Sequence, residues 1–154
     1  MGYALLTEKD KAIPFELLLN LRRPELVAEP LPWERSRAAK RKHLKVWRER
    51  DWLPWLEERL EFPFRALMVF PSKDKRFEVV QVTGLVPMDA DETRYLGIYV
   101  EVPAEDRLLI AGLTNLTPLN ISSPNWMPVA EYHAYREQVG PPPGMRGMPH
   151  IIRP

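Results

Sequence analysis

The sequence predicts an α+β fold in which a small antiparallel β-barrel is flanked by N-terminal helices and one C-terminal helix. Apolar residues recur at helical spacing over residues 37–61, and from residue 64 to residue 111 they alternate with polar ones in short segments separated by polar turns. The 154 residues, of which 45% are hydrophobic, suffice for one core. No apolar run approaches the roughly 18 residues of a membrane-spanning helix.

We divide the chain into an N-terminal arm with a basic helix (1–50), a core of helix, barrel and C-terminal helix (51–138), and a proline-rich tail (139–154). One further helix is expected in the arm, over residues 14–22. The chain has no cysteine, which excludes a disulfide framework and any thiolate metal site. Because no segment near the first residue resembles a signal peptide, a cytoplasmic protein is expected.

Two consecutive helices are expected before the barrel. Ser36 can cap the first, over about residues 37–50, and Asp51 can cap the second. In the second helix the apolar residues recur at helical spacing, and they are Trp52, Trp55, Leu56 and Leu60. Pro63 prevents this helix from continuing, so the aromatic residues around it form a hinge to the first strand.

Four strands joined by short turns are expected to form an antiparallel meander, with a fifth near residues 114–119. The four are rich in Val, Ile, Leu, Phe and Tyr, and they span residues 66–70, 77–86, 95–102 and 107–111. Gly84 inside the second strand indicates a bulge or bend, which is how small barrels turn corners. A last helix is expected from Asn125 to about Glu137, with Asn125 or Ser123 as its N-cap, and Gly140 is expected to end it.

The order of several motifs resembles a known family. A helix with paired tryptophans leads into Leu60-Glu61-Phe62-Pro63-Phe64, and it is followed by Val80–Leu85, Gly97–Val102, Leu116-Thr117-Pro118-Leu119 and Glu131-Tyr132-His133-Ala134-Tyr135. Over about residues 51–137 the chain is similar to the CcbP family of small cyanobacterial calcium-binding proteins and their bacterial relatives. The resemblance implies an SH3-like barrel and calcium binding through carboxylates.

Two groups of acidic residues are the candidate calcium ligands, because calcium takes six to eight hard oxygen ligands. The candidates near the second helix are Glu57, Glu58 and Glu61, and those in the turn between two strands are Asp89, Asp91 and Glu92. The turn is not an EF-hand, since its sixth position is Arg94 and its twelfth is Val100. For both groups the alternative is a solvated acidic surface.

The basic helix supports an alternative function, that of a nucleic-acid-associated or polyanion-binding accessory protein. Eight basic and two acidic residues give residues 33–50 a charge of +6, so the other 136 residues carry −5 of the net +1. The candidate contacts are Arg37, Lys40, Arg41, Lys45 and Arg48. These residues cover most of the helix circumference, and a solvated or intramolecularly paired helix is the competing interpretation.

A non-enzymatic binding or regulatory protein is expected, with calcium as its candidate cofactor. The histidines His43, His133 and His150 lack the spacing of a zinc site, and His133 is interpreted as a helix residue that packs against the barrel. No glycine-rich phosphate loop is present. The basic helix is a candidate surface for a protein or polyanion partner, and the prolines of residues 141–143 are candidates for contact with a neighbour.

Overall fold

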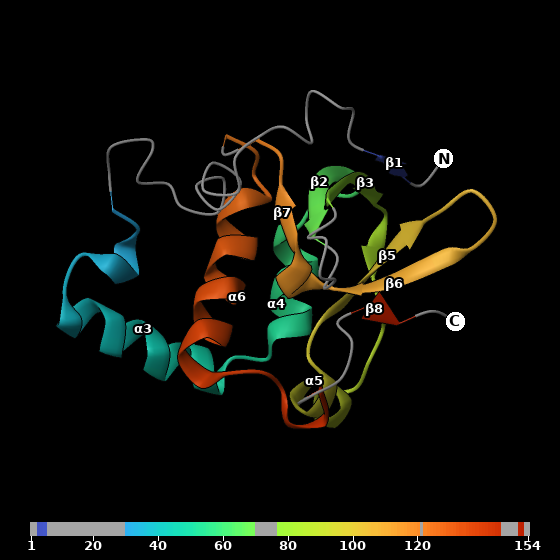
Figure 1. Cartoon of the computed structure of the whole chain (residues 1–154). Helices are drawn as coiled ribbons and strands as arrows, with labels where there is room; N and C mark the ends of the chain where they lie inside the picture. Colours follow the sequence, from blue (N-terminus) through green and yellow to red (C-terminus); the bar gives the residue numbers. More distant parts are fainter. Residues whose placement is uncertain (1–2, 6–29, 70–76, 121, 146–150, 153–154) are drawn as a thin grey trace.

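A computed structural model describes residues 3–5, 30–69, 77–120, 122–145 and 151–152 (Figure 1). The expected helix over residues 14–22 lies outside these residues. The elements run in the order β1 (Tyr3–Leu5), η2 (Pro32–Glu34), α3 (Arg37–Glu49), α4 (Trp52–Arg59), β2 (Phe64–Val69), β3 (Phe77–Val82), β4 (Gly84–Leu85), α5 (Ala90–Leu96), β5 (Tyr99–Pro103), β6 (Leu108–Gly112), η3 (Leu113–Asn115), β7 (Leu116–Pro118), α6 (Trp126–Val139), η4 (Pro143–Met145) and β8 (Ile151–Ile152).

The strands form two antiparallel sheets, with the orders β1-β3-β2-β7 and β4-β5-β6-β8. The α+β class is therefore confirmed, whereas the expected barrel is not, because the described strands do not close into one. The second expected strand divides at Thr83, whose N–H donates to the Glu101 carbonyl at 3.0 Å, and the chain passes there from one sheet to the other. The bend inferred from Gly84 is thus present.

One helix was not expected from the sequence. Residues 87–93 were interpreted as a turn and residue 95 as the start of a strand, but α5 occupies Ala90–Leu96 and β5 begins only at Tyr99. Gly97, with a φ of +90°, ends the helix and redirects the chain. The first residues of the expected strand are therefore helical.

The main hydrophobic core joins both sheets to the helices. Its fully or nearly fully buried side chains include Trp47, Leu56, Met68, Val80, Val82, Val100, Val102, Leu113, Leu116 and Val129. In Figure 1, α6 lies between α3 and the strands, so it covers the core on one side. Among the described helices, none is both long and apolar enough to cross a membrane.

The helix ends follow local chemistry. The Ser36 hydroxyl accepts a hydrogen bond from the N–H of Ala39 at 3.0 Å, as expected of an N-cap, whereas Asp51 stands before α4 without a side-chain capping bond. The Phe62–Pro63 peptide after α4 is cis. Gly140 ends α6 with a φ of +80°, as predicted.

The tail returns to the body of the same chain. A Cβ on Gly144 would lie 2.5 Å from the ring of Tyr95, so the backbone of η4 packs directly against α5. Further on, the backbone of β8 pairs with β6. The described part of the tail therefore occupies a surface of its own chain.

Candidate calcium-binding carboxylates and neighbouring surfaces

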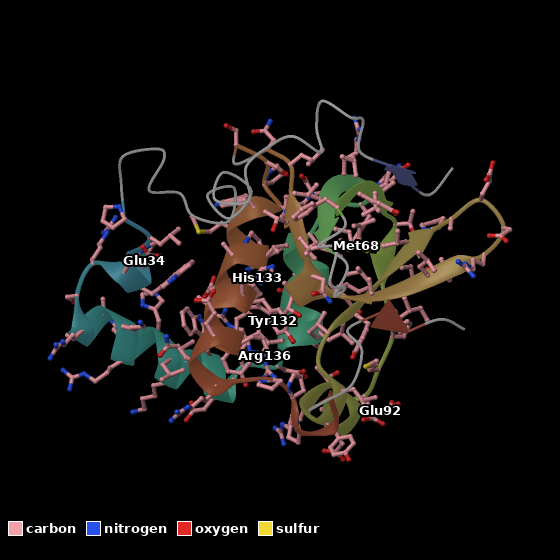
Figure 2. All side chains as sticks on the ribbon, in the orientation of Figure 1. Glu34, Met68, Glu92, Tyr132, His133 and Arg136 are labelled. Atoms are coloured by element: carbon pink, nitrogen blue, oxygen red, sulfur yellow. The ribbon has the colours of Figure 1, made fainter. Side chains whose placement is uncertain are left out.

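The carboxylates expected in a turn lie at the N-terminus of α5. The Asp89 Oδ1 accepts a hydrogen bond from the N–H of Glu92 at 2.8 Å, and the Glu92 Oε1 accepts one from the N–H of Asp89 at 3.1 Å, which is a reciprocal capping box. Asp91 lies between them and is exposed. Figure 2 shows Glu92 on α5, at the lower end of the view. Asp89 and Glu92, two of the three expected ligands, therefore cap the N-terminus of α5.

The other expected ligands lie at the C-terminal end of α4. Glu57 and Glu58 are exposed in its last turn, and Glu61 follows two residues after the helix ends. Glu58 is 3.4 Å from the guanidinium of Arg59, but its side chain is 77% exposed, so solvent screens the pair. The C-terminal end of a helix carries partial negative charge, which adds to that of these carboxylates.

Asn125 fixes the backbone of Glu61. Its Oδ1 accepts a hydrogen bond from the N–H of Glu61 at 2.7 Å, and its Nδ2 donates to the Glu61 carbonyl at 3.1 Å. The side chain expected to cap α6 instead connects the start of α6 to the segment after α4. The Glu61 carboxylate stays exposed beside this junction.

The six expected ligands do not converge on a ready-made calcium site. Within the described ranges, no group of three or more His, Asp or Glu side chains is placed to hold a metal ion. Calcium needs six to eight oxygen ligands, so the described carboxylates alone do not fit a preformed site. What the structure brings together is Asp89 with Glu92, and it does so through helix capping.

The basic helix α3 is attached to the body through one carboxylate of α6. Trp47 is fully buried, and its Nε1 donates to the Glu131 Oε1 at 2.7 Å. A guanidinium N–H of Arg50 donates to the same oxygen at 2.8 Å, and both side chains of this ion pair are 15% exposed. Sequence inspection did not reveal this polar partner of Trp47, which lies 84 positions away.

Arg50 also packs against the tryptophans of α4. Its guanidinium lies 4.7 Å from the ring centre of Trp52 and 4.0 Å from that of Trp55. The Arg59 guanidinium lies 4.3 Å from the ring centre of Trp55. These tryptophans therefore pack against arginines as well as the core, and they serve structure as the sequence indicated.

A small cleft of about 230 Å³ lies beside the C-terminal half of α6, and sequence inspection did not reveal it. Among its walls are Tyr99, Tyr132, His133 and Arg136, the last three of which are labelled in Figure 2. Ligand pockets commonly measure roughly 300–1,000 Å³, so this cleft is small for a cofactor.

Two titratable groups of the cleft, Tyr132 and His133, have backbone partners. The Tyr132 hydroxyl accepts a hydrogen bond from the N–H of Ile98 at 3.1 Å, and the His133 Nε2 lies 2.8 Å from the Leu116 carbonyl oxygen. Burial raises the pKa of Tyr132, and burial together with the nearby Tyr132 raises the pKa of Tyr99 to about 12. Both tyrosines are therefore neutral at physiological pH, and His133 packs against the sheets as expected.

The fold and these surfaces define a small α+β protein with exposed carboxylates, a basic helix and no preformed metal cluster in its described residues. A family model described as calcium binding, that of CcbP, matches residues 45–136, from the second half of α3 to α6. Because this match covers more than half of the chain, the protein belongs to this calcium-binding family. Comparison with curated proteins gave no match, and comparison with solved structures gave none either.

Proposed function

We propose that this chain is a non-enzymatic, cytoplasmic protein that binds calcium weakly and reversibly. The observation that carries the proposal is the family match over residues 45–136. Since no three described acidic side chains converge, water would supply much of the coordination shell. Ligand charge count largely sets calcium affinity, so we expect a dissociation constant of about 10⁻⁴–10⁻³ M.

We propose the end of α4 as the site, with Glu57, Glu58 and Glu61 as ligands. The three exposed carboxylates do not converge on one point, and Arg59 lies beside Glu58, but they share this end of α4 with the negative end of the helix dipole, which attracts a hydrated cation. A cation beside Asp89, Asp91 and Glu92 would instead meet the positive end of α5, and two of those carboxylates are engaged in capping. Electrostatics therefore favours α4 over the segment that the sequence placed in a turn.

Isothermal calorimetry with calcium chloride tests both the binding and its location. The variant E57Q/E61Q removes two charges from the end of α4 and should weaken calcium binding at least about 10-fold. The matched control D89N/D91N removes two charges from α5 but keeps an N-cap residue, and it should bind as the wild type does. The reverse pattern would move the site to α5, and no heat at about 10 mM calcium would exclude binding in the expected range.

The absence of catalysis is part of the same proposal. Its support comes from the cleft, where the Tyr132 hydroxyl accepts a hydrogen bond from the N–H of Ile98 and the His133 Nε2 lies against the Leu116 carbonyl oxygen. A nucleophile needs a general base within hydrogen-bond reach, whereas these two contacts are to backbone groups and serve packing.

We also propose that the two sheets represent an open form of an SH3-like barrel. The support is a path of strands around one core, in the order β7, β2, β3 continuing into β4, β5 and β6. The 3-10 turn η3 leads from β6 to β7, and β7 returns to pair with β2. Among the described strands, backbone pairs join β7 to β2, β2 to β3, β4 to β5 and β5 to β6, whereas β3 leads into β4 along the chain and β6 is not paired with β7.

A further inference from the structure

The solvent-facing side of α3 carries a continuous row of cations. Arg37, Arg41, Lys45 and Arg48 follow one another at intervals of four, four and three residues. At 100° per residue, these side chains fall within a sector of about 80° of the helix, with neighbours on successive turns. The basic residues are thus less dispersed than the sequence suggested, and Lys40 and Lys42 flank the row on either side.

The row is free to meet an external partner. All four of its side chains are exposed, and none forms an ion pair within 4.0 Å with an acidic residue of the described ranges. Arg50 shows the contrast, because it is half-buried and paired with Glu131. The row therefore does not serve to attach α3, since Trp47 and Arg50 fulfil that role.

The charge of the molecule is strongly segregated. Within the described ranges, residues 33–50 carry +6 and the other residues carry −8, and α3 lies at one end of the molecule in Figure 1. Such a distribution attracts a polyanion to one end and repels it from the remainder. The first half of α3, with Arg37 and Arg41, precedes the matched residues 45–136, so this surface extends beyond the shared family region.

The packing of α3 against the protein indicates which class of polyanion the row can bind. The apolar side of α3 faces the protein, where Trp47 is fully buried and His43 and Leu44 are half-buried. An interfacial membrane helix needs that side free for insertion. The row itself contains no aromatic residue on which unpaired bases of a single strand could stack.

We propose that this row binds the phosphate backbone of double-stranded nucleic acid without reading its sequence. At 1.5 Å rise per residue the row spans about 16 Å, a length over which a duplex presents roughly ten phosphate charges. Four cations on one side of a helix can therefore each reach a phosphate. The proposal is independent of calcium binding, because it uses neither group of carboxylates.

The test measures binding of a 20-base-pair DNA duplex of arbitrary sequence by fluorescence anisotropy. The buffer contains EDTA, and the titration is repeated at several potassium chloride concentrations. Four phosphate contacts give a slope of about −3.6 in the logarithm of affinity against the logarithm of salt, or about 150-fold weaker binding at 200 mM than at 50 mM. The variant R41Q/K45Q/R48Q should reduce the slope to about −0.9. The control R65Q/R94Q/R107Q removes three exposed charges elsewhere and should keep the wild-type slope.

Several results would overturn the proposal. They are no duplex binding by the wild type at 50 mM salt, equal losses in the two triple variants, and binding of polyglutamate or of phosphatidylserine vesicles as tight as that of the duplex. Circular dichroism establishes that both variants are folded before binding is compared. Because EDTA removes calcium throughout, a failure here leaves the calcium proposal unaffected, and a negative calcium titration leaves this one unaffected.

Discussion

At the scale of single residues, Glu131 connects parts of the chain that are far apart in sequence. One of its oxygens accepts hydrogen bonds from both Trp47 and Arg50, at 2.7 and 2.8 Å. Truncation in E131A leaves the N–H of a fully buried indole and a mostly buried guanidinium without their acceptor. We expect a loss of about 2 kcal/mol in the free energy of unfolding, measured by urea denaturation.

Two further variants separate the charge of Glu131 from its hydrogen bonds. E131Q keeps an acceptor oxygen for Trp47 but loses the ion pair with Arg50, so its loss should be smaller, about 1 kcal/mol. E137Q, on an exposed position of the same helix, should lie within about 0.5 kcal/mol of the wild type. Equal stability of E131A and E137Q would show that Glu131 does not anchor α3.

Helix caps and helix ends were predictable from the sequence where they depend on residues only a few positions apart. The Ser36 cap and the Gly140 terminus follow from side-chain and backbone preferences within one helical turn, and both are present. Asn125 was expected to cap α6 by the same local logic, yet its side chain bonds the backbone of Glu61, 64 positions earlier. Local preference cannot anticipate such a partner, since chain folding brings it near.

At the scale of elements, Asp89 has a structural role at the start of α5 that the sequence analysis did not assign to it. Asp89 was expected as a metal ligand, which stays a prediction, and its side chain caps α5. D89A should therefore destabilise the protein by about 1 kcal/mol, whereas D89N, which retains a capping side chain, should be nearly neutral. Urea denaturation without calcium measures the stability of both variants.

Calcium titration of D89N completes this comparison, because the variant removes charge while keeping the cap. Unchanged calcium affinity would agree with a purely structural carboxylate. A marked loss of affinity at unchanged stability would instead identify Asp89 as a ligand and contradict the placement at α4.

The elements with strong periodicity were predictable, and those shaped by tertiary context were not. Helices α3, α4 and α6 and most strands lie close to their expected ranges, because their apolar spacing matches the face that they bury. Helix α5 buries none of its residues fully, so its sequence lacks an apolar pattern. The one sequence feature that indicates this helix is the spacing of Asp89 and Glu92, which is that of a capping box. The expected strand divides at Thr83, and its two halves join different sheets. The choice of sheet depends on pairing with strands that are far away in the sequence.

At the scale of the whole molecule, the segregated charge raises the question of what holds α3 in place. One interpretation of the sequence is that the basic helix docks on the acidic face of the same fold. The described contacts instead attach α3 through Trp47, Arg50 and Glu131, while Lys40, Arg41 and Lys45 are exposed. The excess of positive charge in residues 33–50 was predictable from the sequence. Which of those charges form ion pairs within the protein depends on the fold.

Neutralising the exposed cations should therefore leave the folded protein intact. For K40Q/R41Q/K45Q we expect a free energy of unfolding within about 0.5 kcal/mol of the wild type, because solvent screens exposed charges and these three have no described acidic partner. Thermal unfolding at low and high salt measures this, since screening would reveal any ionic docking as a salt-dependent difference. A loss of 2 kcal/mol or more that disappears in E131A would mean that charge docking and the Glu131 junction act together. Stability close to the wild type, combined with weakened duplex binding, would separate the helix surface from the contacts that hold the helix.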